Sequence, residues 1–153
     1  MDESINVDLF TAVSRLMDIN EIELVNYSPL TLAYVGDAVY EMVVRTVVVC
    51  EANMSVNKLH KSSTKLVKAK AQADIIHALS EELTENEMKV YKRGRNAKSY
   101  SKAKNATYSD YRNATGFEAL IGYLYFAKQT DRMMYIIRKG IELIESNDDN
   151  QLK

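Results

Sequence analysis

The chain has 153 residues, 46% of them hydrophobic and 27% charged, with a formal net charge of −1. This is enough sequence for one domain over residues 1–153 with its own apolar core, and it is too apolar for a disordered chain. A single cysteine excludes an internal disulfide framework, two histidines argue against an ordinary zinc site, and no uncharged apolar stretch reaches the length of a membrane span. The acidic first ten residues are unlike a secretory leader, so we expect a cytoplasmic protein.

The first half of the chain predicts three helices. Apolar residues three and four positions apart predict a helix over 7–17. Ser28 followed by Pro29 is a strong helix start, and the valine-rich sequence after it runs for more than twenty residues without a turn signal. A strand is the competing interpretation for residues 43–50, but the length favours a mostly buried helix. Ser55 predicts the cap of a third helix, over 56–79.

The second half continues in the same way. Thr84 and Glu87 match a capping box, which predicts the start of a short helix. That helix is expected to end near 93–94, followed by a polar, basic, mobile loop over 95–107, helices over 109–128 and 131–145, and a frayed tail over 147–153. Together these elements predict an all-α helical bundle.

Two carboxylates interrupt the two most apolar helices. Asp37 lies in VGDAV and Glu118 in GFEALIGYLYF. A carboxylate on a buried helical face is costly unless it is paired or binds a metal. Two of them on different helices could converge on one Mg²⁺, which prefers oxygen ligands and retains several waters. Asp37 capping a helix that restarts there, and Glu118 pairing with a lysine, are the alternatives.

Glu41 follows Asp37 by one helical turn and therefore shares its face. It is a candidate for a group beside the metal ligands, or for a third ligand. The competing interpretation is a salt bridge to Arg45, which lies four residues further along.

The net charge of −1 conceals a strongly basic middle. Residues 1–51 carry a net charge of −7, residues 52–112 carry +7 and residues 113–153 carry −1. Such a block suggests a polyanionic partner, because lysine and arginine contact phosphates regardless of base sequence. A solvated lysine face is the alternative, and the pattern alone does not separate duplex RNA from DNA. The predicted contacts are Lys61, Lys65 and Lys68 on the helix and Arg93, Arg95, Asn96 and Lys98 at the loop.

Several segments then resemble one family. LAYVGDAVYE resembles the signature helix of the ribonuclease III endonuclease domain, and FEALIGYLY is similar to its second signature. Between them, LHKSST, AKAQA and KRGRNAKS resemble the compact branch called mini-ribonuclease III. The resemblance covers the chain from about 28 to 145, and the motifs are specific because they occur together and in order.

The resemblance implies a function. It assigns catalysis and metal binding to Asp37 and Glu118, in a Mg²⁺-dependent endoribonuclease that acts as a homodimer. It further implies cleavage of double-stranded RNA to 5′-phosphate and 3′-hydroxyl ends, in maturation of the 23S ribosomal RNA precursor. Whether a ribosomal protein assists is left open.

Departures from the full-length enzyme keep other functions in view. Acids of that enzyme correspond here to Leu30, Ala33 and Thr115, and we expect no counterpart of its C-terminal RNA-binding domain. One alternative is therefore a non-catalytic RNA-binding or ribosome-associated protein on a degenerate ribonuclease III fold. Another is a helical adaptor for a protein partner, without affinity for RNA.

Overall fold

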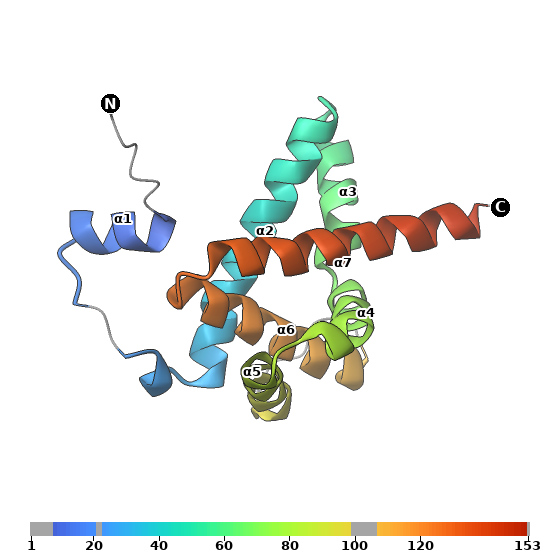
Figure 1. The fold of residues 1–153 in the computed structure, drawn as a ribbon. Coiled ribbons are helices and arrows are strands. Elements are labelled where there is room, and N and C mark those ends of the chain that lie inside the picture. Colours follow the sequence, from blue (N-terminus) through green and yellow to red (C-terminus); the bar gives the residue numbers. More distant parts are fainter. Residues whose placement is uncertain (1–7, 21–22, 99–106, 153) are drawn as a thin grey trace.

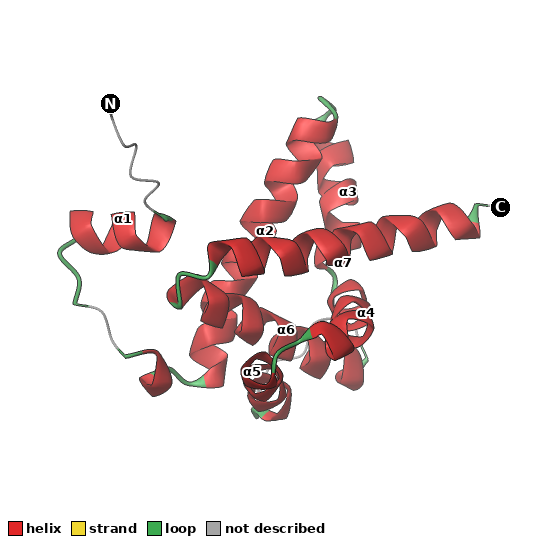
Figure 2. Ribbon diagram, viewed as in Figure 1, coloured by secondary structure: helices red, strands yellow, loops and turns green. Residues whose placement is uncertain are grey.

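The computed structural model describes residues 8–20, 23–98 and 107–152. These residues form helices and no strand, which confirms the predicted all-α class (Figures 1 and 2). None of the described helices is both long and apolar enough to cross a membrane. The α-helices are α1 (Leu9–Leu16), α2 (Pro29–Glu51), α3 (Val56–Val67), α4 (Ala69–Leu79), α5 (Glu85–Asn96), α6 (Tyr108–Phe126) and α7 (Thr130–Gln151), with short 3₁₀ helices η1 (Leu24–Asn26) and η2 (Ser80–Glu82).

The valine-rich segment is one continuous helix, α2, so the strand alternative for residues 43–50 was wrong. Ser28 caps it by accepting a hydrogen bond from the Thr31 backbone N–H at 3.2 Å, and Pro29 occupies the first helical position. Proline fixes φ at the first helical position, and the Ser28 side chain satisfies the free Thr31 N–H, so both residues favour a helix start here.

The predicted helix over 56–79 is two helices. Lys68 is extended between α3 and α4, and the Gln72 side chain donates a hydrogen bond to the Val67 carbonyl at 2.8 Å. That bond satisfies a carbonyl left open at the end of α3. The prediction that Lys68 shares one helix with Lys61 and Lys65 was therefore wrong, because Lys68 lies at the break rather than on α3.

Other boundaries also differ. The capping box at Thr84 and Glu87 is confirmed, and α5 continues to Asn96. Most of the predicted loop, residues 99–106, lies outside the described residues. The predicted end of the last helix near 145 was wrong, because α7 continues to Gln151. A frayed tail over 147–153 stays a prediction. The last turns of α7 line a cleft of about 570 Å³ that also includes Lys65, Lys68 and Lys70, so the acidic end of α7 faces basic side chains.

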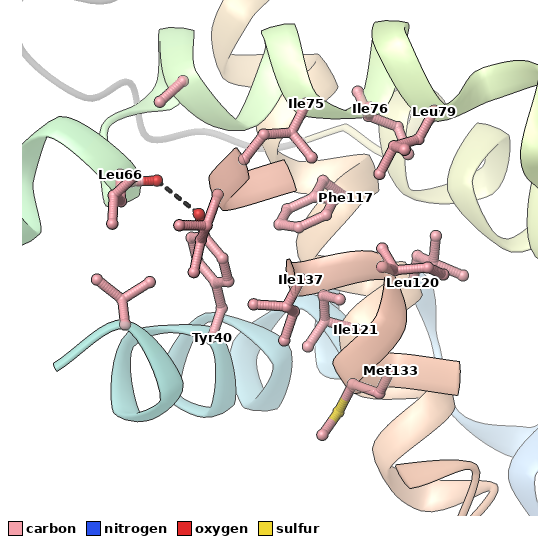
Figure 3. Packing of buried hydrophobic residues seen from close by; sticks show 14 of the residues in the cluster. Tyr40, Leu66, Ile75, Ile76, Leu79, Phe117, Leu120, Ile121, Met133 and Ile137 are labelled. Carbon is pink, nitrogen blue, oxygen red and sulfur yellow. Dashed lines mark hydrogen bonds between the residues drawn. The ribbon is translucent and has the colours of Figure 1, made fainter. Parts of the chain in front are cut away.

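Helix α6 lies at the centre of the bundle and packs against α2, α4 and α5. Its Phe117 ring meets the Tyr40 ring of α2 edge-on, with 5.2 Å between the ring centroids (Figure 3). The Tyr40 hydroxyl donates a hydrogen bond to the Leu66 carbonyl at 2.7 Å, so its one buried polar group is satisfied. The aromatic pair thus ties α2, α3 and α6 into one core.

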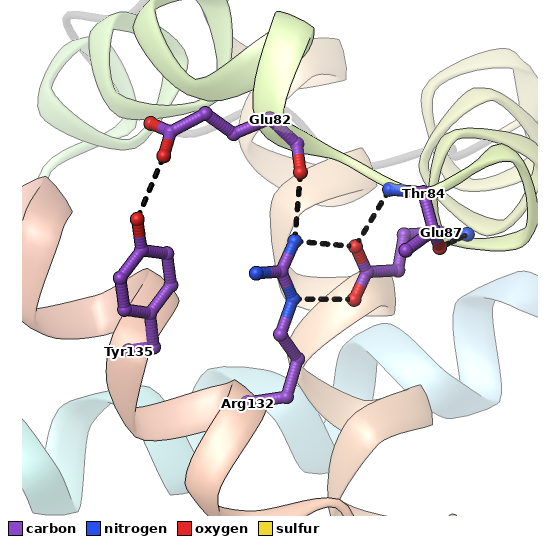
Figure 4. Close-up of polar contacts among 5 residues, drawn as sticks. All are labelled: Glu82, Thr84, Glu87, Arg132 and Tyr135. Carbon is purple, nitrogen blue, oxygen red and sulfur yellow. Dashed lines mark hydrogen bonds and ion pairs between the residues drawn. The ribbon is translucent and has the colours of Figure 1, made fainter.

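A polar clamp joins the start of α5 to the start of α7 (Figure 4). The Glu87 carboxylate accepts hydrogen bonds from Nε and Nη2 of Arg132, both at 2.9 Å, and one from the Thr84 backbone N–H. Arg132 also donates to the Glu82 carbonyl at 2.8 Å. Because the Glu87 side chain is 4% exposed, this ion pair is largely shielded from water.

Candidate active site

Helices α2 and α6 touch through their backbones where two glycines face each other. A Cβ built on Gly36 would overlap the Glu118 backbone carbonyl and lie 2.7 Å from the Gly122 nitrogen. A Cβ on Gly122 would in turn overlap the Leu32 carbonyl. Only glycine permits this approach. The crossing places Asp37, the residue after Gly36, beside Glu118.

The two carboxylates act on each other. Burial raises the pKa of Glu118 to about 9, with the negative charge of Asp37 and a hydrogen bond to it as further causes. Burial also raises the pKa of Tyr40, and the Glu118 charge adds to that rise. Like charges held close in a partly dry site favour the protonated form of one of them. The site is thus short of positive charge.

The geometry decides between the alternatives raised for these acids. Because α2 is unbroken around Asp37, this residue does not cap a restarted helix, and that alternative was wrong. Its side chain is exposed rather than buried as expected, whereas Glu118 is half-buried. In the described part of the chain, no lysine or arginine pairs with Glu118.

The donor set suits a hard cation with few protein ligands. No cluster of three or more His, Cys, Asp or Glu side chains with metal-binding geometry occurs among the described residues. Two carboxylates are nevertheless a sufficient protein contribution for Mg²⁺, which keeps waters and substrate phosphates in its remaining positions. Burial is the main cause of the raised pKa of Glu118, and the negative charge of Asp37, which a bound cation would offset, raises this pKa further.

Glu41 points to a different partner. Its carboxylate accepts a hydrogen bond from Arg45 at 2.5 Å, as the salt-bridge interpretation predicted. A role for Glu41 beside the metal stays a prediction.

Three positions at which the full-length enzyme has further acids carry uncharged side chains in this chain. Ala33 is 8% exposed and Thr115 is 9% exposed. The Thr115 hydroxyl donates to the Tyr111 carbonyl at 3.0 Å, so it is satisfied within α6. Leu30 is 38% exposed.

The predicted RNA contacts lie at the surface but not on one continuous face of a helix. Lys61 and Lys65 are exposed on α3 and Lys68 is exposed at the α3–α4 break. Arg93 is exposed in the last turn of α5, Lys98 is exposed just after that helix, and Arg95 is half-buried. The carboxylate of Asp110, at the start of α6, acts on Lys70 at the start of α4, which indicates that these two helix starts lie near each other.

Sequence reasoning missed Arg112. Its Nε donates to the Arg95 carbonyl at 3.0 Å and its Nη2 to the Asn96 side-chain oxygen at 3.0 Å. The absence of any acidic residue from 88 to 109 was the one available signal that this region holds uncompensated positive charge.

Comparison with known proteins agrees with this geometry. Residues 30–129 match the family described as the Ribonuclease III domain. The chain is 47% identical over 130 residues to Mini-ribonuclease 3 of Clostridium tetani, covering 84% of this chain and 86% of that protein. It is 46% identical over 127 residues to Mini-ribonuclease 3 of Staphylococcus aureus, covering 82% and 93%. A crystal structure of a Fusobacterium nucleatum protein superposes with a TM-score of 0.71 at 30% identity, covering 80% of this chain and 98% of that one.

Proposed function

This chain belongs to the ribonuclease III family of endoribonucleases, and we propose that Asp37 and Glu118 form its active site for cleavage of double-stranded RNA. The observation that carries this proposal is the apposition of the two carboxylates across the Gly36–Gly122 crossing. A pair that costs folding energy without a cation is better explained by function than by stability.

We assign Mg²⁺ as the metal of this metal-dependent family. Asp37 and Glu118 would hold it, and when bound it supplies an activated water and stabilises charge on the transferred phosphoryl group. The Tyr40 ring and its bond to Leu66 keep the α2 side of the site in place. The products would carry 5′-phosphate and 3′-hydroxyl ends.

The duplex would be held by charge. Lys61 and Lys65 on α3, Lys68 at the break, and Arg93, Arg95, Asn96 and Lys98 on and after α5 are the proposed contacts. Lysine and arginine contact phosphates whatever the base sequence is. Such contacts suit A-form RNA, which proteins recognise by its shape and through its phosphates and 2′-hydroxyls. The proposed natural substrate is the 23S ribosomal RNA precursor. A ribosomal protein bound to that precursor is the proposed helper of cleavage.

We further propose a homodimer. Tyr34 is 82% exposed although it lies in the apolar helix α2, one turn before Asp37. Leu30, one turn earlier in α2, is also 38% exposed, and exposed apolar side chains that lie together on a surface can mark an interface with a partner. Dimerisation there would bring two centres near each other, one for each RNA strand.

One assay separates this function from the alternatives. The protein is incubated with duplex RNA and Mg²⁺ beside its Asp37→Asn variant. The proposed endoribonuclease function is supported if the unsubstituted protein cleaves the RNA and the variant binds it without cleaving it. Binding without cleavage by either protein would leave the non-catalytic RNA-binding function. Neither binding nor cleavage would leave the helical adaptor.

A further inference from the structure

The end of α5 and the start of α6 meet through close packing. A Cβ on Gly94 would lie 2.7 Å from the Ala119 Cβ and 2.9 Å from the Gly116 Cα. This contact brings the residues after Gly94 against the first turns of α6. A cleft of about 280 Å³ forms between them, lined by Arg95, Asn96, Tyr108, Ser109, Arg112 and Asn113.

Two guanidinium groups in this cleft share one neutral acceptor. Arg95 Nε donates to the Asn96 side-chain oxygen at 3.3 Å, and Arg112 Nη2 donates to the same oxygen at 3.0 Å. Each guanidinium also lies over a ring, Arg95 at 5.5 Å from the Tyr91 centroid and Arg112 at 5.6 Å from the Tyr108 centroid. Two positive charges are thus held side by side, although they repel each other.

Among the described residues, no carboxylate lines the cleft beside the two arginines. The residues that line the cleft are all polar or basic, and none of them is acidic within the described chain. The nearest acid in sequence, Asp110, is not among the lining residues, and its charge contributes to the raised pKa of Lys70. Burial raises the pKa of Tyr91, and the charges of Arg95 and Arg112 partly offset the rise, so both arginines act on the same buried hydroxyl.

Hydrogen bonds hold two of the residues that line the cleft, Asn113 and Arg112, in place. The Tyr91 hydroxyl donates to the Asn113 side-chain oxygen at 2.6 Å, and Asn113 is 6% exposed. The Arg112 Nε bond to the Arg95 carbonyl fixes one guanidinium against the backbone. Arginines that are oriented before binding lose less conformational entropy when they bind an anion.

We infer that Arg95 and Arg112, held together by Asn96, bind one phosphate group of the RNA backbone between them. Paired guanidinium groups match the tetrahedral oxygens of a phosphate through forked hydrogen bonds. This inference rests on the proposed function for the identity of the ligand as RNA. It adds a discrete anchor, and the new residue Arg112, to the diffuse charge of the lysines.

The test measures duplex RNA binding in the non-cleaving Asp37→Asn protein over a range of salt concentrations. Arg95→Gln and Arg112→Gln should each weaken binding about tenfold and reduce the salt slope by about 1. The double variant should lose less than the product of the two single losses, because both residues serve one phosphate. Arg138→Gln is the matched control, since the Arg138 side chain is 73% exposed on α7 and pairs with Glu142.

Arg112 also holds backbone, so folding needs its own check. Circular dichroism shows whether each variant is folded, and Arg112→Lys keeps the charge while removing the fork. Arg112→Lys should retain the salt slope and still bind RNA more weakly. An unchanged slope in folded Arg95→Gln and Arg112→Gln would overturn the inference, and so would losses in the double variant equal to the product.

A second probe separates this inference from the proposed function. Inorganic phosphate should shift the NMR signals of the Arg95 and Arg112 Nε–H groups, and should leave the Arg138 signal unchanged. If phosphate shifts them but the RNA variants keep the salt slope, the ligand is not RNA and the inference fails. If duplex RNA is neither bound nor cleaved, the proposed function fails, and the phosphate shift then decides whether the arginine pair binds anions at all.

Discussion

Gly36 of α2 packs directly against the backbone carbonyl of Glu118 in α6. This contact does two things at once. It sets the distance between the central helices of the bundle, and it sets Asp37, the next residue, beside the Glu118 carboxylate. The position of the active site is therefore a consequence of helix packing, and a change in that packing should alter stability and activity together.

Gly36→Ala should disrupt the packing of α2 against α6. The added methyl group would meet backbone rather than a movable side chain, so we expect a loss of about 3 kcal/mol or more in the free energy of unfolding. Gly140→Ala is the matched control, because its new Cβ would meet the Ile75 side chain, and a gain in helix propensity offsets part of the strain. Chemical denaturation measures both. Equal losses would show that the α2–α6 contact is not special.

Glu118→Gln should greatly slow cleavage while RNA binding persists. The amide removes one negative metal ligand, and we expect a decrease in the cleavage rate on the order of 10³-fold. Single-turnover cleavage of a duplex RNA in Mg²⁺ measures the rate, and a binding assay without cleavage measures affinity. Glu142→Gln, an equivalent change on the exposed face of α7, serves as the control. Cleavage by Glu118→Gln at the unsubstituted rate would remove this residue from the active site.

The metal-free protein should lose stability as pH rises. The folded-state pKa of Glu118 is raised to about 9 from 4.5, so between these values the folded state holds a proton that the unfolded state has released. The free energy of unfolding therefore falls as pH rises through this window. Glu118→Gln should flatten the fall and stabilise the protein at pH 8, on the order of 1–3 kcal/mol. Added Mg²⁺ should stabilise the unsubstituted protein more at pH 8 than at pH 6. Thermal unfolding curves that do not depend on pH over this range would contradict the prediction.

The clamp between Glu87 and Arg132 should respond to acid in the opposite sense. Burial raises the pKa of Glu87, but the hydrogen bond and charge of Arg132 and the hydrogen bonds from Thr84 together hold it below its ordinary value. Its stabilisation is present above the unfolded-state pKa and is lost as pH falls through the folded-state pKa. Arg132→Gln should cost about 2–3 kcal/mol at pH 7, because it leaves a buried carboxylate unpaired (Figure 4).

An exposed ion pair provides the comparison for Arg132→Gln. Arg138→Gln breaks a pair in which both side chains are more than half exposed, so it should change stability by less than about 1 kcal/mol. Urea denaturation at pH 7 and at pH 4 measures both variants. If Arg132→Gln costs no more than Arg138→Gln, the clamp does not stabilise the junction of α5 and α7.

Tyr34→Lys should produce monomers. A charged side chain at an apolar, 82% exposed position of α2 would oppose burial against a second copy. Sedimentation velocity measures the oligomeric state. Val56→Lys is the control, because Val56 is 79% exposed at the start of α3 and lies outside the proposed contact. A dimer that survives Tyr34→Lys, or one that only Val56→Lys disrupts, would place the interface elsewhere.

The sequence by itself determined much of this protein. Helical periodicity, the cap at Ser28 and the capping box at Thr84 predicted the all-α class and most helix starts, because these signals act within a few residues of each other. Asp37 and Glu118 stood out because each interrupts an apolar helical sequence, and a carboxylate on a buried helical face costs free energy unless it is paired or binds a metal.

Tertiary structure decided what depends on contacts between distant segments. The last turns of α7 line a cleft with Lys65, Lys68 and Lys70, from the region where α3 ends and α4 begins, and periodicity within α7 does not report that contact. Arg112 joined the candidate site only because α5 folds against the start of α6. Periodicity reports which face of a helix is buried, whereas the partner of that face is set by packing among all the helices at once.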